Sequence, residues 1–300
     1  MTLSIFKRRS GARRFRSRAT WATALFALFV LGTLLGLVGG AAAAATAVPL
    51  GTADSFAVLA GAGITNTGPT TVTGDLGTYP TTTMTGTASL TVDGANHAGD
   101  AVTQGAKTDL VTAYNTAAGE GPTSPIAANL GGRTLTPGVY NSASSIGLTG
   151  TLTLNAGGDP TSVFVFQAGS TLTTASASRV VMINGAQSCN VFWQVGSSAT
   201  LGTGSNFQGT ILALTSITVT TGVTVDGRVL ARNGAVTLHT DTITKPSCAA
   251  TTTTAATTTT AATTTTAATN TTAAAKAKAA AKKKAAGHAR PARRHVGFTG

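Results

Sequence analysis

The charged side chains of this chain offer one cluster that could act on a substrate. Asp226, Arg228 and Arg232 lie close together in the sequence, and carboxylates beside basic groups in one groove can cleave a polysaccharide by acid–base chemistry. Asp226 and Arg228 have the same parity along a strand, whereas Arg232 falls past the next corner. The cluster is therefore interpreted as a salt bridge, and we expect no enzymatic activity.

Other kinds of catalytic or metal site lack the residues that they need. His97 and His239 have no Cys or His at the spacing of zinc ligands. No Ser-His-acid order and no phosphate-binding loop stands out. We expect no catalytic residue, no metal and no cofactor.

The two cysteines, Cys189 and Cys248, could form a single bridge. Cysteines in an exported domain favour a disulfide, and this one would pin the last rung of a stacked structure. The alternative is a buried free thiol at Cys189 and an exposed one at Cys248.

Threonine recurs at alternating positions in short apolar segments. Leu152 and Leu154 have the parity of core residues, which places the threonines between them outward. The same parity gives the outward set Thr151, Thr153, Thr171, Thr173, Thr218, Thr220, Thr224 and Thr237. On one flat face these side chains would lie about 6.5 to 7 Å apart along a strand and about 4.7 to 4.9 Å apart between strands. For any single threonine, β propensity on a solvent face is the simpler interpretation, and His239 would interrupt the rank.

Residues 189–213 are the stretch around which the rest of the chain is organised. They form two apolar strands without charge or proline, which indicates strands covered on both faces. Similar segments at 163–169 and 228–233 are each followed by a Thr-rich strand, and Leu212 aligns with Leu230 at a step of about 18 to 19 residues. This repeat predicts the stacked rungs of a β-solenoid.

A helix and a group of short strands precede these rungs. Small and apolar residues within 98–118 have helical spacing, so we expect a helix that covers one face of the solenoid, with Thr103 and Lys107 on its polar side. Residues 48–96 read as the first rungs or as a cap for one open end.

The formal charge of +12 is concentrated at the two ends of the chain. Seven basic residues lie in 7–18 and eight in 276–294, so the six between them face all nine acids and residues 48–248 carry about −3. The central domain therefore lacks the basic surface of a nucleic-acid binder.

Composition divides the chain into four parts. Residues 1–47 have the basic, apolar and small-residue regions of a cleaved signal peptide, although residues 21–38 approach the length of a membrane anchor. Residues 48–248 form the solenoid, 249–274 a Thr/Ala-rich low-complexity linker and 275–300 a basic disordered tail. We expect a secreted, extracellular monomer, held at the cell surface where the tail meets anionic cell-wall polymers, with nucleic acid as a less favoured partner.

Several motifs in this order resemble the ice-binding-protein family of cold-adapted bacteria, fungi and algae. They are residues 50–61, 70–77, the helix, 135–140, 163–167 and the central stretch. The resemblance implies a mainly β fold, a right-handed discontinuous β-solenoid (triangular β-helix) with one long α-helix packed alongside. For activity it implies adsorption to an ice surface through one flat face.

The outward threonines are the candidate ice-contacting residues. This set is Thr151, Thr153, Thr171, Thr173, Thr218, Thr220 and Thr224. The family's Thr-(Ala or Gly)-x-(Thr or Asn) pattern occurs at 67–70, 203–206 and 221–224, but about four matches are expected by chance in so Thr-rich a chain. The alternative function is a structural or adhesive solenoid without ice activity.

Overall fold

The computed structural model describes residues 44–121 and 123–249. The predicted basic tail, and nearly all of the predicted linker and signal peptide, therefore lie outside the described residues. In the described part, no helix is long and apolar enough to cross a membrane.

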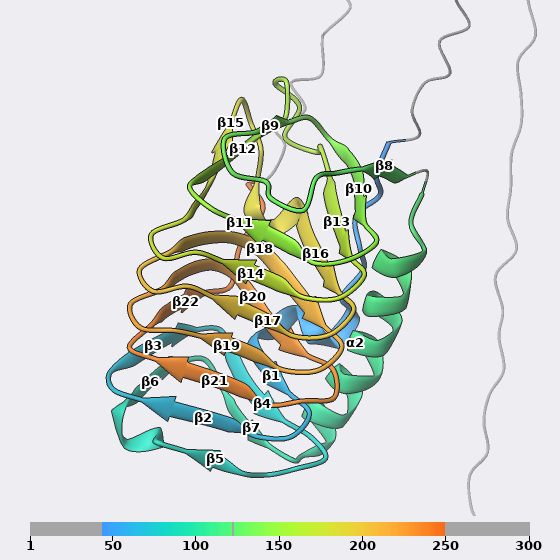
Figure 1. Ribbon diagram of the computed structural model, residues 1–300. Helices are drawn as coiled ribbons and strands as arrows, with labels where there is room; N and C mark the ends of the chain where they lie inside the picture. The colour runs from blue at the N-terminus through green and yellow to red at the C-terminus, as the bar shows by residue number, and fades with distance from the viewer. Residues whose placement is uncertain (1–43, 122, 250–300) are drawn as a thin grey trace, which may run out of the picture. The chain divides into compact units, whose positions relative to one another are not determined.

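The described strands form a parallel β-solenoid whose three flat strips enclose the core (Figure 1). We call the seven-stranded sheet the threonine face. Its strands, in order, are β11 (Ile146–Leu148), β14 (Leu172–Thr174), β17 (Ala199–Leu201), β19 (Ile217–Val219), β21 (Val236–His239), β2 (Ile64–Thr67) and β5 (Met84–Thr85).

The fifteen-stranded sheet supplies the other two strips. The mixed face has β9 (Thr134–Leu135), β12 (Thr151–Asn155), β15 (Arg179–Ile183), the first halves of β18 (Asn206–Ala213) and β20 (Thr224–Ala231), β22 (Thr242–Thr244), β3 (Thr70–Thr73) and β6 (Leu90–Asp93). The helix face has β8 (Thr123–Pro125), β10 (Gly138–Ser142), β13 (Phe164–Ala168), β16 (Val191–Val195), the second halves of β18 and β20, β1 (Phe56–Ala60), β4 (Asp75–Thr78) and β7 (Asn96–Ala98). Short 3-10 turns are η1 (Gly51–Ser55), η2 (Thr87–Ser89) and η3 (Ser188–Asn190).

Two glycines let β18 and β20 turn from the mixed face to the helix face. Gly209 and Gly227 are directly in register, and Gly209 has φ +104°, a conformation that favours glycine. A Cβ on Gly227 would lie 1.9 Å from the carbonyl oxygen of Gly209. Only glycine fits this bend without moving the backbone.

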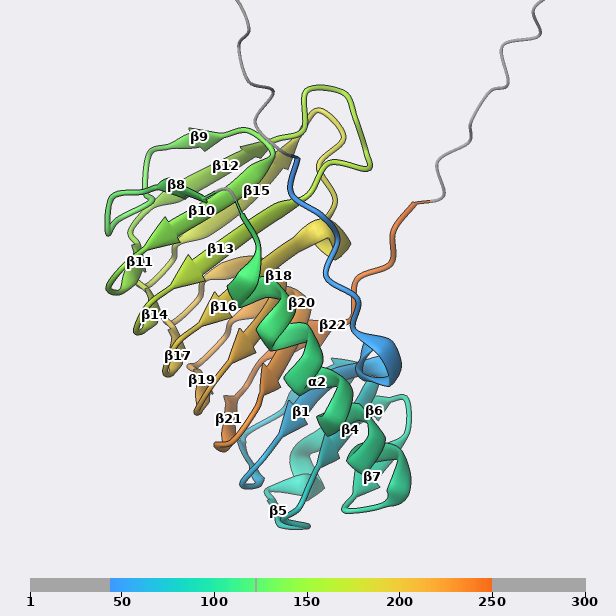
Figure 2. The same ribbon diagram turned by 90° about the vertical axis from the view of Figure 1, so that its right-hand side faces the viewer.

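The coils are not stacked in sequence order, because the first strands of the chain pair with the last coil. β1 pairs with β20, β2 with β21 and β3 with β22. The chain then runs along the stack as helix α2 (Ala101–Gly119) and returns coil by coil from β8 (Figure 2). Residues 48–96 thus form coils at one end of the stack, in agreement with the first of the two sequence-based interpretations.

Aromatic rings stack along the axis of the core. Phe166 lies 4.0 Å from Trp193 between ring centroids, Tyr140 lies 5.5 Å from Phe166, and Phe207 lies 5.0 Å from Trp193. Trp193 Nε1 donates to the carbonyl oxygen of Gln208 at 2.9 Å. Every residue of β16 is buried, because its alternate side chains pack into the solenoid core and under the helix. The expectation that the central stretch is covered on both faces is confirmed for β16 and for the second half of β18, whereas Thr200 of β17 is half-exposed.

Helix α2 packs on the helix face through small and apolar side chains. Ala106, Leu110, Ala113 and Ala117 are fully buried. Asp100 caps the helix, because its carboxylate accepts a hydrogen bond from the Thr103 N–H at 2.8 Å. This bond is the main reason that the pKa of Asp100 is lowered to about 2, and the hydrogen bond with the His97 side chain is the second. Two residues of the predicted polar side were placed wrongly by the sequence pattern, since Thr103 and Lys107 are buried.

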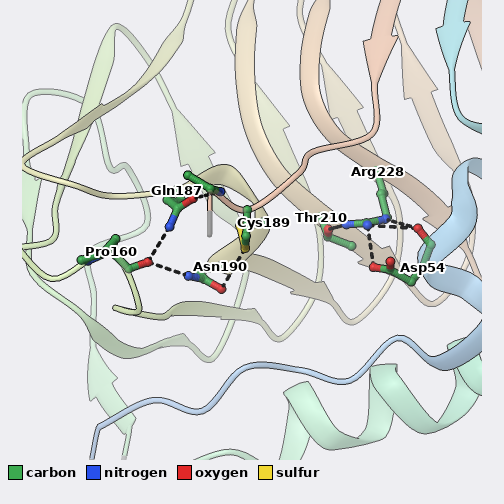
Figure 3. Close-up of a disulfide and its surroundings, with 9 residues drawn as sticks. Asp54, Pro160, Gln187, Cys189, Asn190, Thr210 and Arg228 are labelled. Carbon is green, nitrogen blue, oxygen red and sulfur yellow. Dashed lines mark hydrogen bonds and ion pairs between the residues drawn. A yellow bond between two sulfur atoms is a disulfide. The ribbon is translucent and has the colours of Figure 1, made fainter. Parts of the chain in front are cut away.

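The predicted bridge between Cys189 and Cys248 is confirmed (Figure 3). Cys189 lies in η3 and Cys248 follows the last strand, β22. Beside the bridge, Gln187 and Asn190 both donate from their side-chain amides to the Pro160 carbonyl, at 2.8 and 3.1 Å. The disulfide therefore ties the end of the domain to the loop that leads into the central strand.

Candidate functional site

Six threonines form one unbroken column across the threonine face. The strand register pairs each with the next, in the order Thr173, Thr200, Thr218, Thr237, Thr65 and Thr85. Neighbouring side chains in parallel strands lie about 4.8 Å apart, so the column is about 24 Å long. Helix α2 lies on a different strip, which leaves the column uncovered by it (Figure 2).

The hydroxyls of this column have no protein partner among the described residues. Each of the six threonines is exposed or half-exposed, while the hydrogen bonds of the described chain use other hydroxyls. Their methyl groups and hydroxyls are therefore available to water in a repeating arrangement.

The residues beside the column form hydrogen bonds within the protein that link neighbouring coils. On one side, Ser198 Oγ accepts the Ser216 N–H at 3.3 Å, and Thr171 donates to Ser145 Oγ at 2.8 Å. On the other side, Thr220 donates to the Leu201 carbonyl at 2.7 Å. Because these hydroxyls link one coil to the next, they restrict relative motion of the strands that carry the column.

The threonine face also has little charge. No strand of the seven-stranded sheet, as far as the chain is described, contains a Lys, Arg, Asp or Glu. His239 lies beside the column in register with Thr67, and its Nδ1 bonds to the Thr221 hydroxyl at 2.8 Å. The predicted interruption by His239 was wrong, because Thr237 continues the column.

The threonines of the mixed face have other residue types among their neighbours on adjacent strands. Its outer column runs Thr151, Arg179, Asn206, Thr224, Thr242, Thr71 and Thr91. The neighbouring column contains Thr153, Val181, Asp226, Thr244, Thr73 and Asp93. In the outer column Arg179 and Asn206 separate Thr151 from a run of four threonines. In the neighbouring column Val181, Asp226 and Asp93 interrupt the threonines.

The predicted threonines therefore do not form one rank. Thr173 and Thr218 belong to the column of the threonine face, and Thr171 and Thr220 adjoin the ends of their strands. The remaining three, Thr151, Thr153 and Thr224, lie on the mixed face. The parity argument identified outward residues correctly, but parity alone does not say on which of three faces a strand lies.

Four members of the column are absent from the predicted ice-contacting set: Thr65, Thr85, Thr200 and Thr237, of which Thr237 had been identified only as an outward threonine. Thr200 has the same local signal as Thr218, since Ala199 and Leu201 on either side of it are buried. Thr65 and Thr85 lie in the first part of the chain, and their place in the column follows from pairing with the distant strand β21.

Asp241 secures the corner between the threonine and mixed faces. Its carboxylate accepts the N–H groups of Val223 at 3.0 Å and His239 at 2.6 Å, and its own N–H donates to Thr70 Oγ1 at 3.1 Å. Burial is the main influence on this carboxyl and raises its pKa to about 6, against the N–H bonds and His239, which lower it.

This raised pKa predicts a pH-dependent stability. The folded state binds the proton of Asp241 more tightly than the unfolded state, so the contribution of this group is present below about pH 4 and is lost as the pH rises through about 6. We expect Asp241→Asn to reduce the fall in the free energy of unfolding between pH 4 and pH 6, measured by urea unfolding. His239 is retained in this variant. Asp226→Asn is the matched control and is expected to keep the wild-type fall in the free energy of unfolding. A wild-type fall in Asp241→Asn as well would show that the Asp241 carboxyl does not have the raised pKa.

The cluster considered for catalysis does not assemble. Arg228 is buried and its guanidinium pairs with Asp54 at 2.6 Å (Figure 3), while Asp226 remains on the mixed face. The predicted salt bridge between Asp226 and Arg228 is wrong because the bend at Gly227 separates them. No group of three potential metal ligands occurs among residues 44–121 and 123–249.

Comparison with known proteins finds close similarity over the solenoid. Residues 58–244 match the sequence profile of the family described as Ice-binding-like. The chain is 53% identical over 204 residues to the ice-binding protein of Nostoc sp. (strain HG1), covering 67% of this chain and 76% of that protein. It is 40% identical over 223 residues to the ice-binding protein of a Colwellia species, covering 69% and 87%. The crystal structure of an ice-binding protein from an Antarctic biological consortium superposes with a TM-score of 0.66 at 47% identity, covering 67% of this chain and 92% of that one.

Proposed function

Because this chain belongs to the ice-binding-like family, we propose that it binds ice, and that it does so through the threonine face. The observation that carries the choice of face is the unbroken, uncharged column from Thr173 to Thr85. The proposal involves no chemical reaction and no cofactor.

Surface matching is the mechanism that this column supports. Each threonine presents a methyl group that orders neighbouring water and a hydroxyl that can bond to it. Each contact is weak, but a rigid column makes them act together over about 24 Å. The water held between the side chains then becomes continuous with the ice lattice.

Charge is the reason to favour the threonine face over the mixed face. An ion that leaves liquid water loses hydration worth several kcal/mol, and an ice lattice cannot reorganise to replace it. The mixed face presents Arg179 and Asp226 between its threonines, whereas the threonine face has no such group among its described strands.

Secretion and attachment complete the proposal. The basic, apolar and small-residue regions of residues 1–47 support export, and the eight basic residues in 276–294 support attraction to anionic cell-wall polymers. The protein acts as a monomer, so that the column meets ice directly.

The alternatives predict different results for the purified protein. Ice binding gives thermal hysteresis and inhibits ice recrystallisation, whereas a purely structural or adhesive solenoid gives neither. Release of sugar from cell-wall polymers would instead favour an enzyme. Absence of both ice effects in correctly folded protein would end the proposal.

A charge on the mixed face provides the matched control. Thr242 is exposed in β22, near the centre of that strip. We expect Thr242→Lys to keep nearly all of the thermal hysteresis, and to change the free energy of unfolding by less than about 0.5 kcal/mol. A large loss of hysteresis in this variant would place the mixed face in contact with ice.

A further inference from the structure

A cavity of about 570 Å³ lies where helix α2 meets the corners of the solenoid. Its lining includes Tyr79, Gln104, Lys107, Arg232 and Asn233. Lys107 and Gln104 come from the helix, and Arg232 and Asn233 from the corner that follows β20. The column of threonines is not part of this lining.

Lys107 is a buried ammonium group held at a fixed position. Its Nζ donates to the carbonyl oxygens of Ala231, at 2.6 Å, and of Arg232. An ammonium has three N–H donors, so these two bonds leave one. Burial, and then the charge of Arg232, lower the pKa of Lys107 to about 8, because both disfavour the charged form of the amine.

Arg232 is fixed beside Lys107 by an aromatic ring. Its guanidinium carbon lies 5.4 Å from the centroid of Tyr114. The Tyr114 hydroxyl accepts from Gln194 Nε2 at 2.8 Å and donates to the Val195 carbonyl at 3.4 Å, so the ring cannot turn away. Arg232 Nε is buried and has no hydrogen-bond partner.

Among residues 44–121 and 123–249, no carboxylate forms an ion pair with either cation. The ion pairs of the described residues join Arg228 to Asp54 and His97 to Asp100. Two basic residues thus line one cavity, in a domain whose formal charge is about −3. A buried donor without a partner and an unbalanced pair of charges both cost free energy, and an incoming anion would offset both.

We propose that this cavity binds a small oxyanion, a carboxylate or a phosphate group, between Lys107 and Arg232. The planar guanidinium offers paired N–H donors to two oxygens, and the ammonium adds a point charge. Binding ice does not require this site, since neither cation belongs to the threonine face. The site gives the protein a second ligand, an anionic molecule or the acidic group of a polymer.

The test follows the arginine side chain of the whole protein by NMR. Titration with inorganic phosphate, and separately with acetate, is expected to shift the Arg232 Nε–H signal along a saturating curve. Binding to the variants is read from the backbone N–H signal of Asn233, which lines the same cavity. On this signal Arg232→Gln is expected to weaken binding by about tenfold or more, since a charge-assisted bond is lost. Arg179→Gln, which removes a charge from the mixed face, is the matched control and is expected to bind as the wild type does.

The choice of variant keeps the result decisive. Lys107 fastens the helix to the corner, so Lys107→Met can fail to fold, whereas Arg232→Gln leaves both Lys107 bonds to the backbone intact. The basic ends of the chain bind anions equally in all variants, so the difference between Arg232→Gln and Arg179→Gln reports the cavity alone. If the Arg232 signal shifts with only one of the two anions, that result identifies whether the site prefers a phosphate or a carboxylate group. An unchanged Arg232 signal with both anions, or equal binding by the two variants, would overturn the proposal.

Discussion

Thr218→Lys is expected to reduce thermal hysteresis to about a tenth of the wild-type value or less. Thr218 lies in the middle of the column, between Thr200 and Thr237. A lysine there raises a long charged side chain above the flat face and must be dehydrated when ice approaches. That costs several kcal/mol, and about 1.4 kcal/mol already weakens adsorption tenfold.

The fold should not change with this substitution. Thr218 is half-exposed, and substitutions at such strand positions usually alter the free energy of unfolding by less than about 0.5 kcal/mol. Hysteresis is measured at matched concentrations for the wild type, Thr218→Lys and the mixed-face control Thr242→Lys. Wild-type hysteresis in a folded Thr218→Lys protein would show that another face meets the ice, or that the column reflects only β propensity.

Removal of the disulfide is expected to cost about 4 kcal/mol of the free energy of unfolding. The bridge joins cysteines 59 residues apart, and the chain-entropy relation gives about this value for a loop of that length. The double variant Cys189→Ser/Cys248→Ser is compared with the wild type by urea unfolding. The double variant should lose as much free energy of unfolding as the wild type loses when a reducing agent is added.

Two independent results could contradict the pairing. Thiol titration of the denatured, unreduced protein is expected to find no free cysteine, and two free thiols would exclude the bridge. Equal unfolding midpoints with and without reducing agent would show that the bridge contributes nothing, although it ties the end of the domain to η3.

The coils could be predicted from the sequence because their signals are local. Leu212 and Leu230 are in register, as the repeat indicated. Leu152 and Leu154 are buried, and Thr151 and Thr153, which alternate with them, are exposed or half-exposed. The earlier coils are longer: Thr151 pairs with Arg179 and Thr173 with Thr200. A repeat of constant length therefore could not place them.

The assignment of residues to faces depends on pairing between distant segments. Thr65 joins Thr237 because the first strands close the last coil. The burial of Lys107 likewise depends on the carbonyl groups of a corner more than a hundred residues away. Helical spacing suggested that this lysine faces solvent, because the pattern of one segment contains no information on the partner that satisfies it.

The most direct test of the central claim is the partition of the protein into slowly growing ice. Ice is grown on a cooled surface in stirred solutions of the wild type, Thr242→Lys and Thr218→Lys, each in a separate experiment. The amount of protein in the ice and in the remaining liquid is then measured. Adsorption through the threonine face predicts that the wild type and Thr242→Lys are enriched in the ice, whereas Thr218→Lys stays in the liquid. Exclusion of the wild type from ice, or enrichment of Thr218→Lys equal to that of the wild type, would contradict it.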